Sequence, residues 1–170
     1  MFYLDTCVII AYGLKEDPNH EKAVNVIEKM KKINGMSKIC TSTLTLVELY
    51  SALSRNIQKY KLPPGIEEIV NDRIKLRATV AYLLLLLSVH IFPDDSELSS
   101  LDGLRLFSKF SGAISLSIEL KLKTLDLLHI AYASELAKQK SIRFFITLDS
   151  EIISKKDIIL KVTGIEIMNE

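Results

Sequence analysis

The stretch FFITLD at residues 144–149 decides the fold class, because it is an unbroken apolar and β-favouring run that ends on an acid. Strands that are buried on both faces read as continuous apolar runs, and they belong to parallel sheets covered by helices. We therefore predict a strand over Ile142–Leu148. The N-terminus has the same form, since Phe2-Tyr3-Leu4 is apolar and Asp5 follows it.

Helical patterns separate strand-like segments along the rest of the chain. Asp17-Pro18 is typical of a helix start, and apolar residues then recur at helical spacing until Gly35. The expected strands are Phe2–Asp5, Lys38–Thr41, Ser88–Phe92, Ile142–Leu148 and Ile165–Met168, and the further expected helices are Thr43–Asn56, Ile66–Leu86, two helices within Ser96–Leu120 separated near Gly112, and Leu125–Gln139. This β-α alternation predicts an α/β fold with a central parallel sheet and helices on both faces.

Length and composition indicate one globular domain over residues 1–170. Hydrophobic residues make up 48% of the chain and charged residues 25%, and the net charge of +1 excludes a chain that is basic throughout. The longest apolar run, Val80–Leu87, has 8 residues, well short of the roughly 20 that span a bilayer. The N-terminus lacks the pattern of a secretory signal, and Cys7 and Cys40 have no metal-type spacing. We expect a cytoplasmic protein with reduced thiols and no membrane segment.

Four acids sit at the ends of apolar segments or in the first turns of expected helices: Asp5, Glu48, Asp126 and Asp149. An acid among buried residues is costly unless a cation compensates it. In open parallel sheets, ligands bind outside the carboxyl ends of the strands, so these acids are expected to converge on one rim. Oxygen ligands without histidine or cysteine favour Mg²⁺ or Mn²⁺.

The segments around these acids carry a family resemblance. They are LDT at residues 4–6, TLTLVEL at 43–49, LDLLHIA at 125–131 and FITLD at 145–149. Together and in this order they resemble the motifs of PIN-domain ribonucleases, in the VapC-like branch that includes the toxins of VapBC toxin–antitoxin pairs. The resemblance implies a three-layer α/β/α sandwich and a Mg²⁺- or Mn²⁺-dependent endoribonuclease. It also implies a homodimer, RNA as substrate and a small antitoxin protein as partner.

The same resemblance assigns roles to individual residues. Asp5, Glu48, Asp126 and Asp149 would be both the metal ligands and the catalytic residues, supported by the hydroxyls of Thr6 and Thr147. Residues 59–110 are not explained by the family core, and we expect them to be a helical insertion that serves assembly. Lysines near the last two acids are candidate RNA phosphate contacts, although solvated loop lysines have the same pattern: Lys121, Lys123, Lys155 and Lys156.

Each acid also fits a structural role. Glu48 fits a capping box with Thr45, Asp126 complements a helix dipole, and Asp5 and Asp149 are suited to cap the turns that follow them. His129 shares a helix face with Asp126, and a satisfied buried histidine is the favoured interpretation.

Two other functional classes remain open. A phosphatase of the haloacid-dehalogenase type, or a receiver-type phosphotransferase, also begins with a strand-terminal Asp, but the former needs a second Asp where this chain has Cys7. A non-catalytic PIN-like RNA- or protein-binding module is the other alternative, and four converging negative charges argue against it as an RNA-binding surface.

Overall fold

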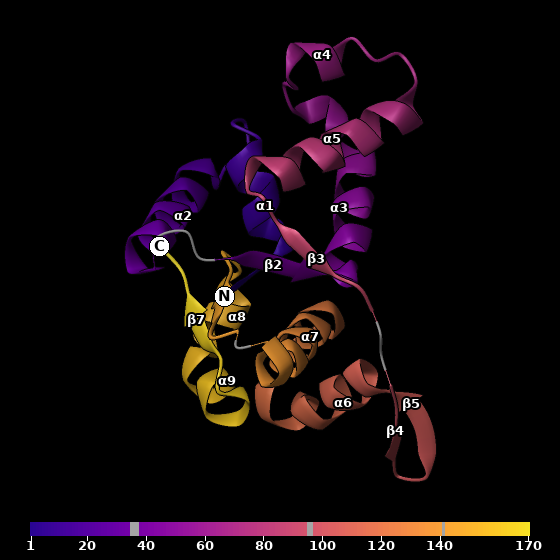
Figure 1. Ribbon diagram of the computed structural model, residues 1–170, viewed down its shortest axis with the longest axis vertical. Coiled ribbons are helices and arrows are strands. Elements are labelled where there is room, and N and C mark those ends of the chain that lie inside the picture. Colours follow the sequence, from indigo (N-terminus) through magenta and orange to yellow (C-terminus); the bar gives the residue numbers. More distant parts are fainter. Residues whose placement is uncertain (35–37, 95–96, 141) are drawn as a thin grey trace.

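The computed structural model describes residues 1–34, 38–94, 97–140 and 142–170 and shows a sheet between two layers of helices (Figure 1). The strands are β1 Phe2–Leu4, β2 Ile39–Ser42, β3 His90–Phe92, β4 Leu98–Leu101, β5 Leu104–Phe107, β6 Phe144–Ile146 and β7 Glu166–Met168. The helices are α1 Thr6–Gly13, α2 His20–Asn34, α3 Thr43–Asn56, the 3₁₀ turn η1 Ile57–Lys59, α4 Pro64–Glu67, α5 Asp72–Leu86, α6 Ser108–Leu120, α7 Thr124–Lys140, α8 Ser150–Ser154 and α9 Lys156–Thr163. All five predicted strands are present, while the predicted helix stop at Gly35 lies outside the described residues.

The main sheet has five strands in the order β3-β2-β1-β6-β7, and every pair in it is parallel. The chain moves outward from β1 through β2 to β3 and then returns to place β6 on the other side of β1. The strand order therefore reverses between β1 and β6. In open α/β sheets this reversal opens a crevice at the carboxyl ends of the strands, which is where ligands bind.

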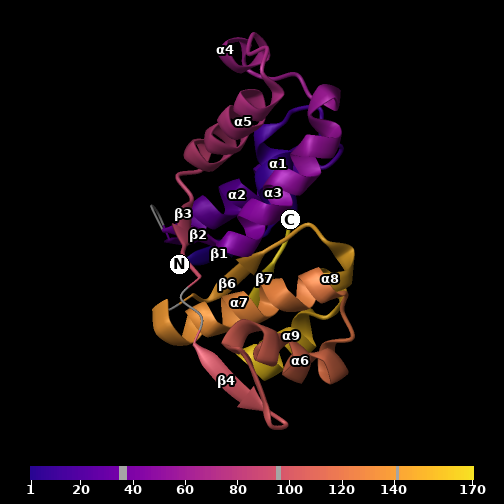
Figure 2. The same cartoon turned by 90° about the vertical axis from the view of Figure 1, so that its right-hand side faces the viewer.

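Alternating side chains of the central strands build two separate cores. Phe2, Leu4 and Phe144 are buried in a cluster with residues of α1, α2, α3 and α5. Tyr3 and Phe145 point to the opposite face and pack with residues of α6, α7, α8 and α9. Figure 2 shows these two groups of helices on either side of the sheet. The three-layer α/β/α sandwich is thereby confirmed.

The predicted helix Ile66–Leu86 is interrupted. The short helix α4 begins at Pro64, and α5 starts only at Asp72, where Asn71 caps it by accepting a hydrogen bond from the Ile74 amide at 3.1 Å. Asparagine at an N-cap satisfies an amide that has no partner inside the helix. The capping residue therefore fixes the start of α5 later than hydrophobic spacing alone suggests.

The prediction of two helices within Ser96–Leu120 is wrong. Leu98–Phe107 instead forms the antiparallel hairpin β4–β5, and a single helix α6 follows it with Gly112 in its interior. The turn residues Asp102 and Gly103 have positive φ values of 49° and 81°. Asp-Gly is a strong two-residue hairpin signal because both positions of such a turn require φ above zero. That local turn signal explains the hairpin.

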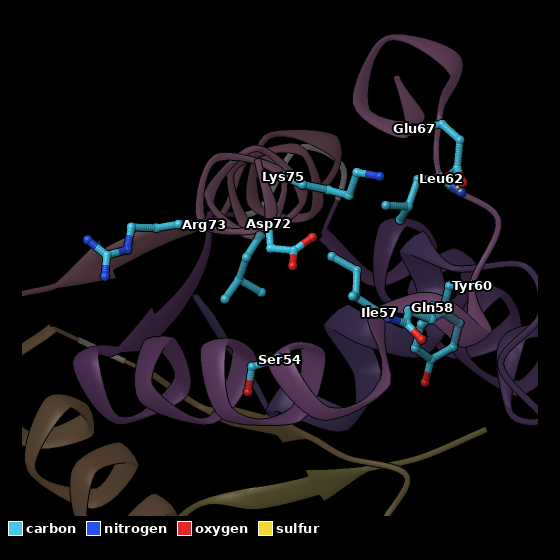
Figure 3. A pocket seen from close by; sticks show the side chains of 10 residues that line it. Ser54, Ile57, Gln58, Tyr60, Leu62, Glu67, Asp72, Arg73 and Lys75 are labelled. Atoms are coloured by element: carbon cyan, nitrogen blue, oxygen red, sulfur yellow. Dashed lines mark hydrogen bonds between the residues drawn. The ribbon is translucent and has the colours of Figure 1, made fainter. Parts of the chain in front are cut away.

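Residues 59–110 contain both helices and strands. This stretch includes α4 and α5, but it also supplies β3 to the main sheet and the whole of the β4–β5 hairpin. It is therefore not helical throughout, and its status as an insertion stays a prediction. A cavity of about 510 Å³ lies where the end of α3 and η1 meet the start of α5, lined by Tyr60, Glu67, Asp72 and Lys75 among others (Figure 3).

Helix α5 packs on the core through part of its apolar run. Val80, Leu83 and Leu87 are buried, whereas Leu85 is 75% exposed and Leu86 45% exposed. The contact with α1 is close, because a Cβ built on Gly13 would lie 2.1 Å from Cδ2 of Leu83. Among the described residues, no helix combines the length and apolar character that crossing a membrane requires.

Candidate active site

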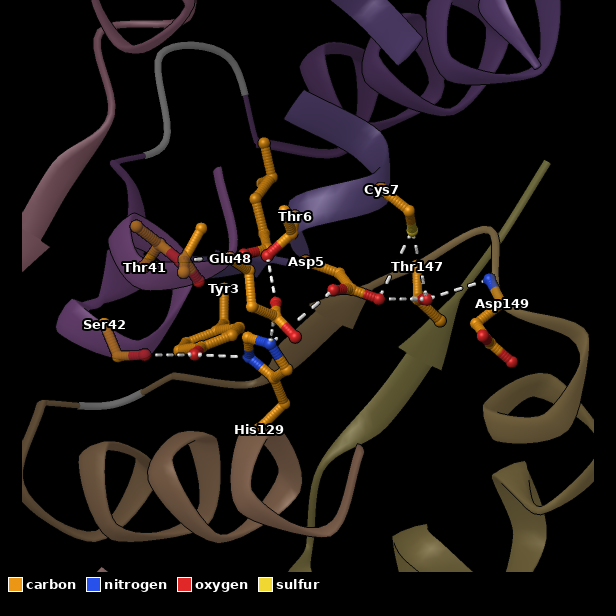
Figure 4. A network of polar contacts seen from close by, with 12 residues as sticks. Tyr3, Asp5, Thr6, Cys7, Thr41, Ser42, Glu48, His129, Thr147 and Asp149 are labelled. Atoms are coloured by element: carbon orange, nitrogen blue, oxygen red, sulfur yellow. Dashed lines mark hydrogen bonds and ion pairs between the residues drawn. The ribbon is translucent and has the colours of Figure 1, made fainter. Parts of the chain in front are cut away.

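Asp5 lies at the carboxyl end of β1 and is 7% exposed. It occupies the N-cap position of α1 without a side-chain cap bond, so its predicted capping role is wrong. Its Oδ2 instead accepts a hydrogen bond from Thr147 Oγ1 at 2.6 Å, and Cys7 Sγ donates to the same oxygen at 3.3 Å. Thr147 also accepts a bond from the Asp149 amide at 3.0 Å. The hydroxyl of Thr147 thus ties together the segments that follow β1 and β6, as Figure 4 shows.

Glu48 lies in the second turn of α3, and its carboxylate is held by two other elements. Its Oε2 accepts hydrogen bonds from the Thr6 hydroxyl and from His129 Nε2, the latter at 2.5 Å. The predicted capping box with Thr45 is wrong, because the N-cap of α3 is Ser42 and Glu48 lies beyond the first turn. Burial opposes ionisation of Glu48, but the bonds from His129 and Thr6 outweigh it and lower its pKa.

Asp126 is in the first turn of α7, as the helix-dipole interpretation requires. Burial, together with the negative charges of Asp149 and Asp5, raises its pKa from 3.8 to about 6. The structure therefore brings the charges of two acids that are remote in sequence close enough to oppose the ionisation of Asp126.

Asp149 follows β6 and caps α8, as its structural interpretation predicted. Its Oδ1 accepts from the amides of Glu151 at 2.7 Å and Ile152 at 3.4 Å. A carboxylate has two oxygens, so capping through Oδ1 is compatible with a ligand role for Oδ2.

All four predicted acids line one pocket of about 400 Å³. Its lining includes Asp5, Glu48, Asp126 and Asp149, together with Thr6, Cys7 and His129. Within it, donor atoms of Asp5, Glu48 and His129 lie within 4.8 Å of one another, the one such group found among the described residues. Asp126 and Asp149 border this inner group. The pocket lies at the reversal of strand order between β1 and β6, where an α/β sheet binds its ligands.

A family model for the PIN domain matches residues 2–158. The chain belongs to the PIN domain family. This match, with the strand order above, sets aside the haloacid-dehalogenase and receiver alternatives.

Solved structures share the PIN fold at low sequence identity. The toxin VapC20 of Mycobacterium tuberculosis, which cleaves the sarcin–ricin loop, superposes with a TM-score of 0.52 at 17% identity, covering 91% of this chain and 95% of its own. VapBC2 from Rickettsia felis, bound to a promoter DNA fragment, superposes with a TM-score of 0.52 at 16% identity. The match covers 98% of this chain and 97% of the Rickettsia chain. FitAcB from Neisseria gonorrhoeae superposes with a TM-score of 0.52 at 17% identity, and the match covers 99% of this chain and 97% of the Neisseria chain. Comparison with curated proteins gave no match.

Three residues of this PIN domain site were not predicted from the sequence. Arg55 and Ser51 line the pocket, and Arg55 Nη1 donates to Ser51 Oγ at 2.6 Å. Both lie on the face of α3 that carries Glu48, at spacings of three and seven residues, so helical periodicity would have found them. Cys7 also lines the pocket, and burial, with the negative charge of Asp5, raises the pKa of its thiol well above the usual value.

His129 is both buried and part of the site. It is 1% exposed, as its predicted structural role requires, yet its Nε2 faces Glu48 and lies 4.0 Å from Asp5 Oδ1. On the other side of the ring, Nδ1 is hydrogen-bonded to the hydroxyl of Tyr3, and that hydroxyl is in turn hydrogen-bonded to Ser42 Oγ (Figure 4). No sequence pattern connects these residues, because they are distant in the chain and meet only through packing.

Three of the four candidate lysines surround a second pocket. Lys121, Lys123 and Lys155 line a cavity of about 400 Å³ together with Glu151, which bonds Lys123 Nζ at 2.9 Å. Lys156 is exposed at the start of α9. Of these lysines, Lys123 interacts electrostatically with Asp126 and Asp149 of the acidic pocket.

The donor set fits a divalent metal ion. Carboxylate oxygens are preferred by hard divalent cations, and the acids of this pocket supply them from four different elements. Burial raises the pKa of Asp126 most, and the negative charges of Asp149 and Asp5 raise it further. A bound cation would remove that repulsion.

Proposed function

We propose that this PIN domain is a Mg²⁺- or Mn²⁺-dependent endoribonuclease. The observation that carries the proposal is the convergence of Asp5, Glu48, Asp126 and Asp149 on one pocket at the carboxyl edge of the sheet. Four separate capping roles would not require these acids to share a pocket, and for Asp5 and Glu48 other contacts replace the expected caps. A shared cation accounts for the arrangement with one cause.

The four carboxylates would hold the ion. When bound, a divalent ion offsets the negative charge that grows on a phosphodiester during hydrolysis and lowers the pKa of water. The protein's own part is preorganisation: Thr147 fixes Oδ2 of Asp5, and Thr6 fixes Oε2 of Glu48. Carboxylates oriented by such bonds need little rearrangement when the ion and substrate arrive. Hydrolysis would leave 5′-phosphate and 3′-hydroxyl ends, as the family resemblance implies.

Positive side chains in the acidic pocket and around the second pocket are suited to contact RNA. Arg55 lies within the acidic pocket, and Lys121, Lys123 and Lys155 surround the adjacent one, with Lys156 nearby in the chain. Contacts of this kind go to phosphates and position the strand without reading its sequence. They also compensate the repulsion between an acidic centre and a polyanion.

The structural neighbours support a place in a toxin–antitoxin pair. VapC20 is a sarcin–ricin loop cleaving toxin, and the Rickettsia structure is a VapBC complex. By analogy, this chain would be a toxin that acts in the cytoplasm, self-associates as a homodimer and is held by a small antitoxin protein. Residues 59–110 would serve assembly, since they carry the exposed leucines of α5.

The test is cleavage of a structured RNA by chelator-treated protein. Cleavage should appear on addition of Mn²⁺ or Mg²⁺, disappear with chelator and leave 5′-phosphate ends. Asp5→Asn should lower the rate at least about a hundredfold, because a carboxylate of the site is lost. Glu28→Gln, an exposed change on α2, is the matched control and should be fully active. Cleavage that persists in chelator would contradict the proposal, and RNA binding without cleavage under either metal would favour the non-catalytic module.

A further inference from the structure

His129 changes the donor set of the pocket from oxygen alone to oxygen and nitrogen. Its Nε2 lies 2.5 Å from Glu48 Oε2 and 4.0 Å from Asp5 Oδ1. Ligand atoms about 2.1 Å from a common ion lie at most about 4.2 Å apart, so these donors fit one coordination sphere after small adjustments. The sequence had predicted an oxygen-only site, which the position of this imidazole does not match.

The far side of the imidazole is arranged as it is in histidines that bind metals. The phenol oxygen of Tyr3 lies 3.1 Å from Nδ1, and Ser42 Oγ lies 2.7 Å behind it. Tyr3 can accept a bond from Nδ1–H while it donates to Ser42, which leaves the Nε2 lone pair directed at the carboxylates. A hydrogen bond from the other ring nitrogen is the usual means of fixing the tautomer and orientation of a metal-binding histidine.

Packing keeps the ring in this orientation. Tyr3 and Phe145 contact the imidazole edge-on, with ring centroids 6.1 Å and 6.5 Å away, and both aromatic residues are fully buried. Nε2 therefore stays directed at Oε2 of Glu48, 2.5 Å away, and at the carboxylate of Asp5. These three donor atoms lie within 4.8 Å of one another, as the ligands of one metal ion would.

We propose that His129 is a nitrogen ligand of the metal ion, alongside Asp5 and Glu48, and that the site therefore selects Mn²⁺ over Mg²⁺. The inference rests on the proposed metal-dependent function and adds to it a ligand and a metal preference. Imidazole suits first-row transition metals, whereas Mg²⁺ keeps to oxygen ligands and water. The two carboxylates retain the affinity for hard ions, so the site takes Mn²⁺ as an ion that accepts both donor types.

Pulsed electron paramagnetic resonance of the Mn²⁺-loaded full chain tests the ligand directly. The spectrum should contain a ¹⁴N coupling from a bound imidazole, and growth on ¹⁵N-histidine should convert it to a ¹⁵N coupling without any mutation. His129→Gln should abolish the coupling and weaken Mn²⁺ binding by about ten- to a hundredfold, with a smaller effect on Mg²⁺. His90→Gln, on the exposed edge strand β3, is the matched control and should retain both.

Tyr3→Phe separates ligation from orientation. The coupling should remain while Mn²⁺ binds about tenfold more weakly, because the ligand is kept and its supporting bond is lost. Mn²⁺ binding by the wild type without nitrogen coupling would overturn the proposal and leave an oxygen-only nuclease site intact. Metal-dependent RNA cleavage, measured separately, decides the proposed function whatever the spectrum shows.

Discussion

Asp126 is one of the four acids of the site, and the folded protein opposes its ionisation. Burial and the charges of Asp149 and Asp5 raise its pKa to about 6. Near neutral pH the carboxyl group is therefore ionised in both states, but its ionisation costs more free energy in the metal-free folded protein than in the unfolded chain. This cost is present above pH 6 and disappears below the ordinary pKa of 3.8, where the group is protonated in both states. The site is therefore built at the expense of stability.

Asp126→Asn should abolish cleavage and stabilise the metal-free protein at pH 7.5. Because the carboxyl is partly exposed and screened by solvent, we expect a gain of about 1 kcal/mol in the free energy of unfolding. The gain should vanish near pH 3.5, since wild type is then neutral at this position. Urea unfolding with chelator at both pH values measures it, and Asp102→Asn, in the β4–β5 turn, is the control. A loss of stability at pH 7.5 would indicate that Asp126 chiefly complements the dipole of α7.

Thr147 has a narrower task, which is to orient Asp5. Thr147→Val keeps the shape of the side chain but removes the bond to Asp5 Oδ2 and leaves the Asp149 amide without its acceptor. We expect unfolding to become easier by about 1–3 kcal/mol and cleavage to fall about ten- to a hundredfold. The control is Thr79→Val, since Thr79 is also fully buried but bonds only the Lys75 carbonyl within α5 in the described contacts. Unchanged cleavage in Thr147→Val would remove this hydroxyl from the site.

At the scale of elements, α5 illustrates how one apolar run serves two surfaces. Val80, Leu83 and Leu87 face the core, while Leu85 and Leu86 face outward. The inner side of the run is buried in the protein's own core, and the exposed leucines leave self-association as a prediction for the outer side.

Leu86→Lys should weaken self-association at least about tenfold without unfolding the chain, because a charge replaces an exposed leucine at the proposed contact. Sedimentation equilibrium across micromolar concentrations measures the effect. Ile118→Lys is the control, since Ile118 is 78% exposed on α6 in the opposite helical layer. A monomeric wild type at these concentrations would rule out a homodimer through α5, and a loss confined to Ile118→Lys would move the contact to α6.

At the scale of the whole molecule, the metal would add one more link between segments that the sheet and the hydrogen bonds of Thr147, Thr6 and His129 already connect. Its ligands come from the ends of β1 and β6 and from α3 and α7, so an ion that binds only the folded state stabilises all of them together. The size of the effect depends on the ion concentration relative to its dissociation constant.

Mn²⁺ at a hundred times its dissociation constant should add about 2.7 kcal/mol to stability, and for a chain of this size the melting temperature should rise by about 5–10 °C. Asp149→Ala should reduce that rise and also lower the metal-free melting temperature, because the cap of α8 is lost. Asp149→Asn retains a capping oxygen, so it should reduce only the rise. Differential scanning calorimetry measures the melting temperatures. Equal rises with Mn²⁺ in wild type, Asp149→Ala and Asp149→Asn would place the ion elsewhere.

The sequence by itself determined the layers of the fold and the gathering of the acids. Continuous apolar strands such as Phe144–Ile146 require a sheet covered on both faces, and acids that follow parallel strands must share an edge. The sequence also encodes the β4–β5 hairpin locally, since Asp102-Gly103 favours the positive φ angles that its turn requires.

Only the tertiary structure decided which acid contacts which partner. Glu48 and His129 are 81 residues apart, and their contact depends on how α3 and α7 pack at the same sheet edge. Helical periodicity gives the face on which a residue lies but not the neighbour that this face meets, because distant segments are brought together by packing of the whole core. The nitrogen donor, the Tyr3–Ser42 support behind it and the second pocket of lysines all follow from that packing.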